Sequence, residues 1–272
     1  MIKHIFSDMD GTLLQSNCKI SENNVKAIRD SQIPFTLVSA RSPREMIETI
    51  DKLDLQEPQI AFNGGLIFQQ TNQGKKILQS EPIDVDGIKQ VLSVLKQEFP
   101  DVSCSLYDLD NWYVEKIDKG IEYEASACDF EPIVTDFVSL LKQNDLKIFK
   151  IMLISFDLQE MKAMNEKLEH LNSGDLTVTQ SAENYIEITH KLAQKSRGIK
   201  YIKDLENLDK EDMAAFGDGY NDLVMLEQVG TPIVMDNALP GVKDYAKYIT
   251  KDNDHDGVAF GIQKYLVSES SM

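Results

Sequence analysis

The sequence has no apolar run near the length of about 18 residues that a membrane-spanning helix requires. Its longest apolar stretch, residues 149–156, is short and is interrupted by Lys150. The chain begins MIKHIFSDMDGTLL, without the apolar segment and small-residue cleavage site of a secretory signal. We therefore expect a cytoplasmic protein that has no membrane partner.

Cysteine is also scarce. Cys18, Cys104 and Cys128 are the three cysteines of the chain, and no two of them form a Cys-x-x-Cys pair. Neither a disulfide framework nor a zinc knuckle is supported by this odd number at unrelated spacings. We expect ordinary thiols at all three positions.

Basic residues are too few to balance the acidic ones. Lysine and arginine number 28 against 45 aspartates and glutamates, which gives a formal net charge of −17. Such a surface repels nucleic acid at long range, so no nucleic-acid partner is expected. It repels a phosphate ester as well. A phosphate site in this chain must therefore be made locally positive by a metal ion, a lysine or oriented backbone N–H groups.

Strand and helix patterns alternate at both ends of the chain. Apolar strands are expected at 3–6, 34–39, 58–62, 213–216 and 231–235, with helices after Ser21, after Pro43, over 195–205 and over 221–228. Repeated strand–helix–strand units of this length imply right-handed crossovers and a parallel sheet. The fold class is therefore α/β, with a Rossmann-like catalytic core formed by residues 1–82 and 190–272.

The middle of the chain, residues 83–189, follows another pattern. The expected order is helix, two strands, helix, strand, helix and two strands, with Asp157 and Glu160 spaced as a capping box. This order predicts a separate, inserted α+β domain.

The sharpest local signal is Asp8-Met9-Asp10-Gly11-Thr12-Leu13, directly after the first apolar strand. Ligands of open α/β sheets collect at the carboxyl ends of strands, where two neighbouring carboxylates can share one magnesium ion and one phosphoryl group. Gly11 permits a sharp turn away from the strand. The alternative is an acidic surface turn, since Asp-Gly is a common turn pair.

A second acidic cluster, Gly217-Asp218-Gly219-Tyr220-Asn221-Asp222, follows the strand at 213–216. Mg²⁺ prefers oxygen ligands, and Asp8, Asp218 and Asp222 can supply them. An N-cap followed by a turn is the alternative for this segment.

Two weaker signals gain meaning in combination with these. Ser39 ends the second strand, and its hydroxyl with the backbone N–H groups of Ala40 and Arg41 can hold a phosphate, although a helix cap would look the same. Lys195 opens the helix after the inserted unit, where a lysine is usually exposed. Together the four elements supply, in order, the groups that phosphoryl transfer needs.

With these motifs the chain resembles the haloacid dehalogenase-like hydrolases, and among them the Cof-type phosphatases with a large α+β (type IIB) cap. The resemblance spans nearly the whole sequence and implies that residues 83–189 form the α+β cap domain. It rests on DMDGTL, VSAR, the Asn63-Gly64 pair, the lysine after the cap, GDGYND and the closing NDHDGV. Two departures are Ser39, where threonine is frequent, and Ser196, where glycine is more usual.

Such a cap is expected to exclude water from the site and to contact the leaving group. Candidates for that contact, beside an ordinary packing role, are Trp112, Tyr113, Tyr185 and Glu187.

The resemblance implies a role for each matching residue. Asp8 is expected to be the nucleophile, and Asp10 the general acid/base whose carbonyl also binds magnesium. Ser39 is expected to bind phosphate, and Lys195 to hold both the nucleophile and the phosphate. The remaining expectations are Asp218 as a direct Mg²⁺ ligand, Asp222 as a direct or water-mediated ligand, and Asn221 as a neighbour of the phosphate or the lysine.

The implied activity is magnesium-dependent hydrolysis of small phosphorylated metabolites, such as sugar phosphates, through an aspartyl-phosphate intermediate. A phosphotransferase or phosphomutase of the same superfamily would use Asp8 identically and pass the phosphoryl group to a sugar hydroxyl. A catalytically silent regulator is disfavoured because Asp8, Asp10, Lys195 and Asp218 are all present. The tail around Asp254 and Gly257 is expected either to form an acidic loop near the metal or to be a capped turn.

Overall fold

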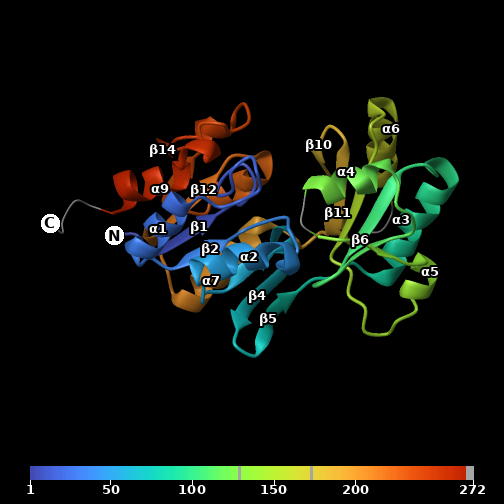
Figure 1. Ribbon diagram of the computed structural model, residues 1–272, viewed down its shortest axis with the longest axis horizontal. Helices are drawn as coiled ribbons and strands as arrows, with labels where there is room; N and C mark the ends of the chain where they lie inside the picture. Colours follow the sequence, from blue (N-terminus) through green and yellow to red (C-terminus); the bar gives the residue numbers. More distant parts are fainter. Residues whose placement is uncertain (128–129, 172–173, 268–272) are drawn as a thin grey trace. The chain divides into compact units, whose positions relative to one another are not determined.

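The computed structural model describes residues 1–127, 130–171 and 174–267 (Figure 1). Cys128 lies outside these residues. The chain forms two compact units. The first contains Met1–Ala40, Met46–Gln79 and Gln194–Met272, and the second contains Arg41–Glu45 and Ser80–Ala193. The predicted boundaries after residues 82 and 189 stay a prediction.

A parallel sheet forms the centre of the first unit. Its order is β14-β13-β12-β1-β2, and all its pairs are parallel. The strands are β1 (His4–Ser7), β2 (Phe35–Leu37), β12 (Met213–Gly217), β13 (Thr231–Val234) and β14 (Tyr248–Ile249). Every residue of β1 and β12 is buried, as expected for central strands covered on both faces. The predicted parallel-sheet core is confirmed.

Three helices begin where the sequence predicts them: α1 (Glu22–Ser31), α2 (Pro43–Leu53) and α7 (Lys195–Glu206). The first unit also contains α8 (Leu223–Leu226) and α9 (Gly257–Gly261), of which α9 was not predicted. Ser21 caps α1, because its side chain accepts a hydrogen bond from the backbone N–H of Asn24. Ile199 and Ile202 of α7 pack with Phe6 of β1 in one hydrophobic cluster.

Two parts of this unit differ from the expectation. The helix predicted over 221–228 is a 3₁₀ turn, η3 (Tyr220–Asp222), followed by the short α8, because the Asp222 carboxylate accepts the N–H groups of the preceding turn. The sequence analysis also missed a hairpin. Strands β4 (Leu66–Thr71) and β5 (Gly74–Ser80) extend β3 (Gln59–Ala61) into a separate three-stranded sheet.

The second unit is the expected α+β assembly. Its sheet has the order β10-β11-β9-β6-β7-β8. The strands are β6 (Ser103–Tyr107), β7 (Trp112–Val114), β8 (Ile133–Val134), β9 (Lys150–Ile154), β10 (Leu176–Ala182) and β11 (Tyr185–His190). Helices α3 (Val85–Glu98) and α6 (Leu158–Glu169) share a hydrophobic core with β9. The short α5 (Phe137–Leu140) was predicted, whereas α4 (Lys119–Ala127) was not.

Side chains in this unit settle two details of the sequence analysis. Asp157 caps α6 as predicted, but Glu160 accepts a hydrogen bond from the Ser155 hydroxyl, so the reciprocal half of the capping box is not formed. Trp112 is fully buried, and its Nε1 donates to Ser105 Oγ at 2.7 Å. It is therefore a packing residue.

None of the helices in the described part of the chain combines the length and apolar character that crossing a bilayer requires.

The start of α9 leaves no room for a side chain. A Cβ on Gly257 would lie 2.1 Å from the carbonyl oxygen of Lys251 and 2.8 Å from that of Asp252. We expect Gly257→Ala to lower the free energy of unfolding by about 1–3 kcal/mol, because backbone must move to relieve the clash. Urea denaturation measures this. Gly174→Ala is the control, since a Cβ there meets nothing within 4 Å; equal stability of the two variants would contradict the prediction.

Candidate active site

Parallel strands deliver the predicted acidic residues to one edge of the sheet. Asp8 directly follows β1, and Asp218 directly follows β12, the strand beside it. Ser39 lies two residues beyond the end of β2 on the other side of β1. All three positions are at carboxyl ends, where ligands of open α/β sheets collect.

Lys195 is buried between two carboxylates. Its Nζ donates to Asp8 Oδ1 at 2.5 Å and to Asp222 Oδ1 at 2.7 Å. The Lys195 side chain is 1% exposed, although it is the first residue of α7, a position where lysine is usually solvated. This ion pair joins residues 187 positions apart in the chain.

Burial and the neighbouring carboxylates raise the proton affinity of Asp8. Burial raises the pKa of Asp8 well above its usual value, the charge of Asp222 raises it further, and Lys195 opposes both. Burial lowers the pKa of Lys195, but the charges of Asp222 and Asp8 outweigh that effect and raise it. The lysine is therefore an ammonium ion, and the cluster holds more negative charge than one lysine neutralises.

Asp218 is held by the turn that follows the first strand. Its Oδ1 accepts a hydrogen bond from Thr12 Oγ1 at 2.6 Å. Burial raises the pKa of Asp218 to about 6, and the Thr12 hydroxyl opposes the shift. Gly11 has a φ of +75°, and a Cβ there would lie 2.5 Å from Asp218 Oδ2. Glycine is thus needed at position 11 both for its backbone conformation and for space.

Asp222 uses both carboxylate oxygens within the protein. Oδ1 accepts from Lys195, while Oδ2 accepts from the backbone N–H groups of Asp218 and Gly219, each at 2.9 Å. The residue is fully buried. Asp222 therefore orients the lysine and the turn that carries Asp218. It is better placed for a water-mediated contact with a cation than for direct ligation.

Asp8, Asp218 and Asp222 each place one carboxylate oxygen within 4.8 Å of the others. Asp10 lies close enough for its charge to be among the causes that raise the pKa of Asp8 and Asp218, behind burial in both cases. A set of carboxylate oxygens with negative charge in excess fits a hard divalent cation. The predicted residues are thus brought together in a way that can hold one.

The predicted phosphate-binding residues occupy different environments. Ser39 is buried, its N–H donates to the carbonyl of Ile60 at 2.9 Å, and Ala40 is half-buried. Asn221 is exposed on η3, and Lys195 bonds to Asp8 and Asp222. Asp10 is exposed.

The sequence analysis missed the contacts of Thr12 and Asn237. Thr12 was quoted only as part of DMDGTL, and Asn237 follows the apolar strand β13 in the segment MDNALP. Asn237 Nδ2 donates to the carbonyl of Gly11 at 2.8 Å. The strand-end rule that selected Asp8 and Asp218 would also have selected Asn237.

Removing the buried ammonium should destabilise the protein in a pH-dependent way. We expect Lys195→Met, in metal-free buffer, to lose about 3–5 kcal/mol of unfolding free energy at neutral pH, because buried carboxylates lose their counter-charge. A carboxyl whose pKa is higher in the folded state stabilises that state when protonated, so the loss should shrink at pH 5 and grow at pH 8. Urea denaturation at both values measures it.

The matched control is Lys200→Met on the same helix. Lys200 pairs with Asp204 at the surface, with side chains 69% and 61% exposed. Such a pair contributes at most about 0.5 kcal/mol, so this variant should resemble the unaltered protein at either pH. A pH-independent loss in Lys195→Met would contradict the assignment of Lys195 as the counter-charge of the carboxylates.

Comparisons with known proteins place this chain in a single family. The sequence profile of the haloacid dehalogenase-like hydrolases matches residues 5–262. A Haemophilus influenzae protein that carries a phosphatase name is 30% identical over 97% of this chain and 98% of its own length. The 5-amino-6-(5-phospho-D-ribitylamino)uracil phosphatase YwtE of Bacillus subtilis is 28% identical, with 97% and 98% covered.

Solved structures agree in fold. A haloacid dehalogenase-like hydrolase from Bacteroides thetaiotaomicron superposes with a TM-score of 0.88 at 25% identity, covering 97% of this chain and 99% of that one. The HAD subclass IIB sugar phosphatase BT4131 superposes with a TM-score of 0.79 at 19% identity, covering 97% and 98%. At that identity the second comparison concerns the fold alone, which is the expected core with a cap sheet.

Proposed function

We propose that this chain, which belongs to the haloacid dehalogenase-like hydrolases and is a phosphatase, uses Asp8 as the nucleophile toward a phosphate monoester. The observation that carries the proposal is the Asp8–Lys195 ion pair beside Asp218 and Asp222, at the carboxyl ends of β1 and β12. A buried carboxylate held by a buried lysine is fixed in direction, which favours in-line attack.

The cofactor we propose is Mg²⁺. Asp8, Asp218 and the backbone carbonyl of Asp10 are the candidate direct ligands, with Asp222 acting through water because its oxygens already accept three hydrogen bonds. When bound, the ion supplies positive charge that offsets the repulsion between Asp8 and a phosphate dianion. Asp218 is oriented for this by Thr12.

In the first step an oxygen of Asp8 bonds to phosphorus, and the bond between phosphorus and the ester oxygen breaks. The carboxylic acid of Asp10 gives its proton to the departing alcohol. In the second step the Asp10 carboxylate takes a proton from water, whose oxygen attacks phosphorus and frees Asp8 and inorganic phosphate. Lys195, with Ser39, the N–H of Ala40 and Asn221, stabilises charge on the transferring group.

The substrate class we propose is a small polyhydroxylated metabolite in which phosphate esterifies a primary hydroxyl. One of the similar proteins supports this: YwtE, 28% identical, is named for a phosphorylated ribityl compound. A net charge of −17 disfavours larger polyanionic substrates such as nucleic acid.

Replacing the nucleophile tests the mechanism. We expect Asp8→Asn to lower kcat by on the order of a thousandfold or more, since an amide cannot form the acyl phosphate. Phosphate release from a panel of sugar and ribityl phosphates, without any acceptor sugar, measures the change. Trapping of a phosphorylated aspartate in the unaltered protein should label Asp8. Undiminished turnover in Asp8→Asn would refute the assignment, and phosphate release only when an acceptor sugar is added would favour a phosphotransferase.

Metal removal tests the cofactor. Protein treated with a chelator should release no phosphate, and Mg²⁺ should restore activity. We expect Asp218→Asn to raise the Mg²⁺ concentration for half-maximal activity by at least about tenfold, because it weakens one proposed ligand. Asp204→Asn, at an exposed position on α7, is the control and should need no more Mg²⁺ than the unaltered protein. Full activity of the chelated protein would overturn the proposal of a metal.

A further inference from the structure

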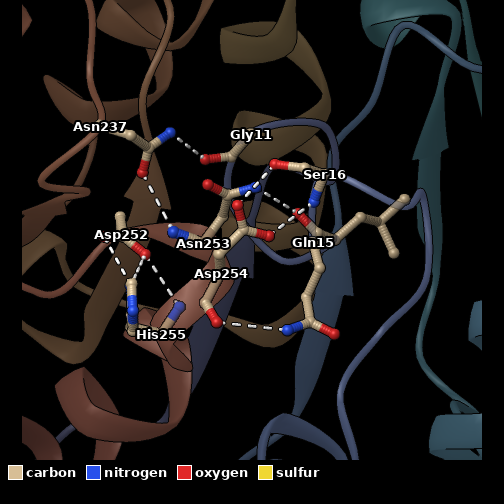
Figure 2. Close-up of polar contacts among 9 residues, drawn as sticks. Gly11, Gln15, Ser16, Asn237, Asp252, Asn253, Asp254 and His255 are labelled. Atoms are coloured by element: carbon tan, nitrogen blue, oxygen red, sulfur yellow. Dashed lines mark hydrogen bonds and ion pairs between the residues drawn. The ribbon is translucent and has the colours of Figure 1, made fainter.

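Two asparagines from late in the chain hold the backbone of the turn that carries Asp10. Asn237 Nδ2 donates to the carbonyl of Gly11 at 2.8 Å, and Asn253 Nδ2 donates to the carbonyl of Leu14 at 2.9 Å (Figure 2). The two amides are themselves linked, because the backbone N–H of Asn253 donates to Asn237 Oδ1 at 3.1 Å. Asn237 and Asn253, called the relay below, therefore bind the turn at carbonyls on both sides of Thr12.

Backbone contacts within the turn link Asp10 to the far end of the turn. A backbone bridge pairs Asp10 with Leu14, and Leu14 N donates to the carbonyl of Met9 at 2.8 Å. The carbonyl of Leu14 is thus the far end of the loop that begins at Asp10, and Asn253 fixes it. Asn237 fixes the peptide between Gly11 and Thr12, one residue beyond Asp10. Asp10, Asn237 and Asn253 also line one surface hollow.

The segment that carries Asn253 is anchored independently of the relay. Asp254 accepts from the backbone N–H and the hydroxyl of Ser16, at 2.8 Å and 2.6 Å. Asp252 accepts from the N–H of His255 at 2.8 Å, which closes the 3₁₀ turn η5 (Asn253–His255) (Figure 2). Loss of one relay amide therefore removes a contact to the Asp10 turn and leaves the later contacts in place.

We infer that Asn237 and Asn253 are positioning residues for Asp10. The inference rests on the proposed role of Asp10 as the group that protonates the leaving alcohol and deprotonates water. Both amides act on carbonyls of the turn, at Gly11 and Leu14, whereas Lys195 holds Asp8 and is itself held by Asp222. Their loss should consequently affect proton transfer more than formation of the Asp8–phosphorus bond.

The dependence of the phosphorylation rate on the leaving group separates an effect on proton transfer from an effect on formation of the Asp8–phosphorus bond. An aryl phosphate whose phenol is acidic, such as p-nitrophenyl phosphate, departs without a proton, whereas an alkyl phosphate such as a hexose 6-phosphate needs one. With Asn237→Ala and Asn253→Ala we expect single-turnover phosphorylation by the aryl phosphate to stay within about twofold of the unaltered protein. Phosphorylation by the alkyl phosphate should slow about 10–100-fold, as expected for a displaced catalytic group.

The second step should slow with either substrate, because Asp10 must then deprotonate water. A burst of p-nitrophenol followed by a slow steady state is therefore expected in the variants. Because the two side chains hold separate carbonyls, at Gly11 and Leu14, the double variant should be slower than either single variant. Asn237 is exposed, so Asn237→Ala retains a folded protein for these measurements.

Asn23→Ala is the matched control. Asn23 Nδ2 donates to Asp256 Oδ2 at 2.7 Å, so it joins the same two regions of the chain without touching the Asp10 turn. This variant should behave as the unaltered protein. Equal slowing of aryl and alkyl phosphorylation in the relay variants would overturn the inference in favour of general loosening of the site. Failure of the unaltered protein to form any Asp8 phosphate would instead refute the proposed function.

Discussion

The active-site arrangement depends on one buried ammonium group. Asp8, Asp218 and Asp222 gather their oxygens in one place, in a chain that already carries a net charge of −17. Burying carboxylates without a counter-charge costs several kcal/mol for each ion, so the fold must bring a cation with them. Lys195 meets this need from the first position of α7, where burial of a lysine is unusual, because both of its partners accept hydrogen bonds from the same Nζ.

The contacts around Asp8 join the two ends of the chain within the first unit. Sheet order places β1 between β12 and β2, so the first strand of the chain is central and its carboxyl end is surrounded by later segments. Thr12 reaches Asp218, and Asn237 reaches the carbonyl of Gly11. The second unit can be inserted before Lys195 without disturbing these contacts, since each of them lies within the first unit.

The positions of Asp8 and Asp218 were predictable because the sequence patterns that mark them are local. A short apolar strand followed by carboxylates selects Asp8 and Asp218 without any knowledge of the remaining chain. The role of Asp222 was not predictable, because it depends on a turn in which one oxygen meets two backbone N–H groups while the other meets a lysine. The β4–β5 hairpin was missed because its second strand, Gly74–Ser80, is largely polar and half-exposed and has no clear period-two pattern.

Charge also orders the binding events of the proposed reaction. Asp8, Asp218 and Asp222 carry three negative charges when ionised, and Lys195 returns one positive charge, so a phosphate dianion meets a net charge of −2 at the metal-free site while Asp10 is protonated. Binding of one divalent ion brings that charge to zero, so the dianion is no longer repelled as it approaches Lys195 and the N–H groups near Ser39. Electrostatics therefore favours entry of the cation before the substrate. The same surplus makes cation binding stabilise the folded chain, by about 2.7 kcal/mol at a concentration of 100 times Kd.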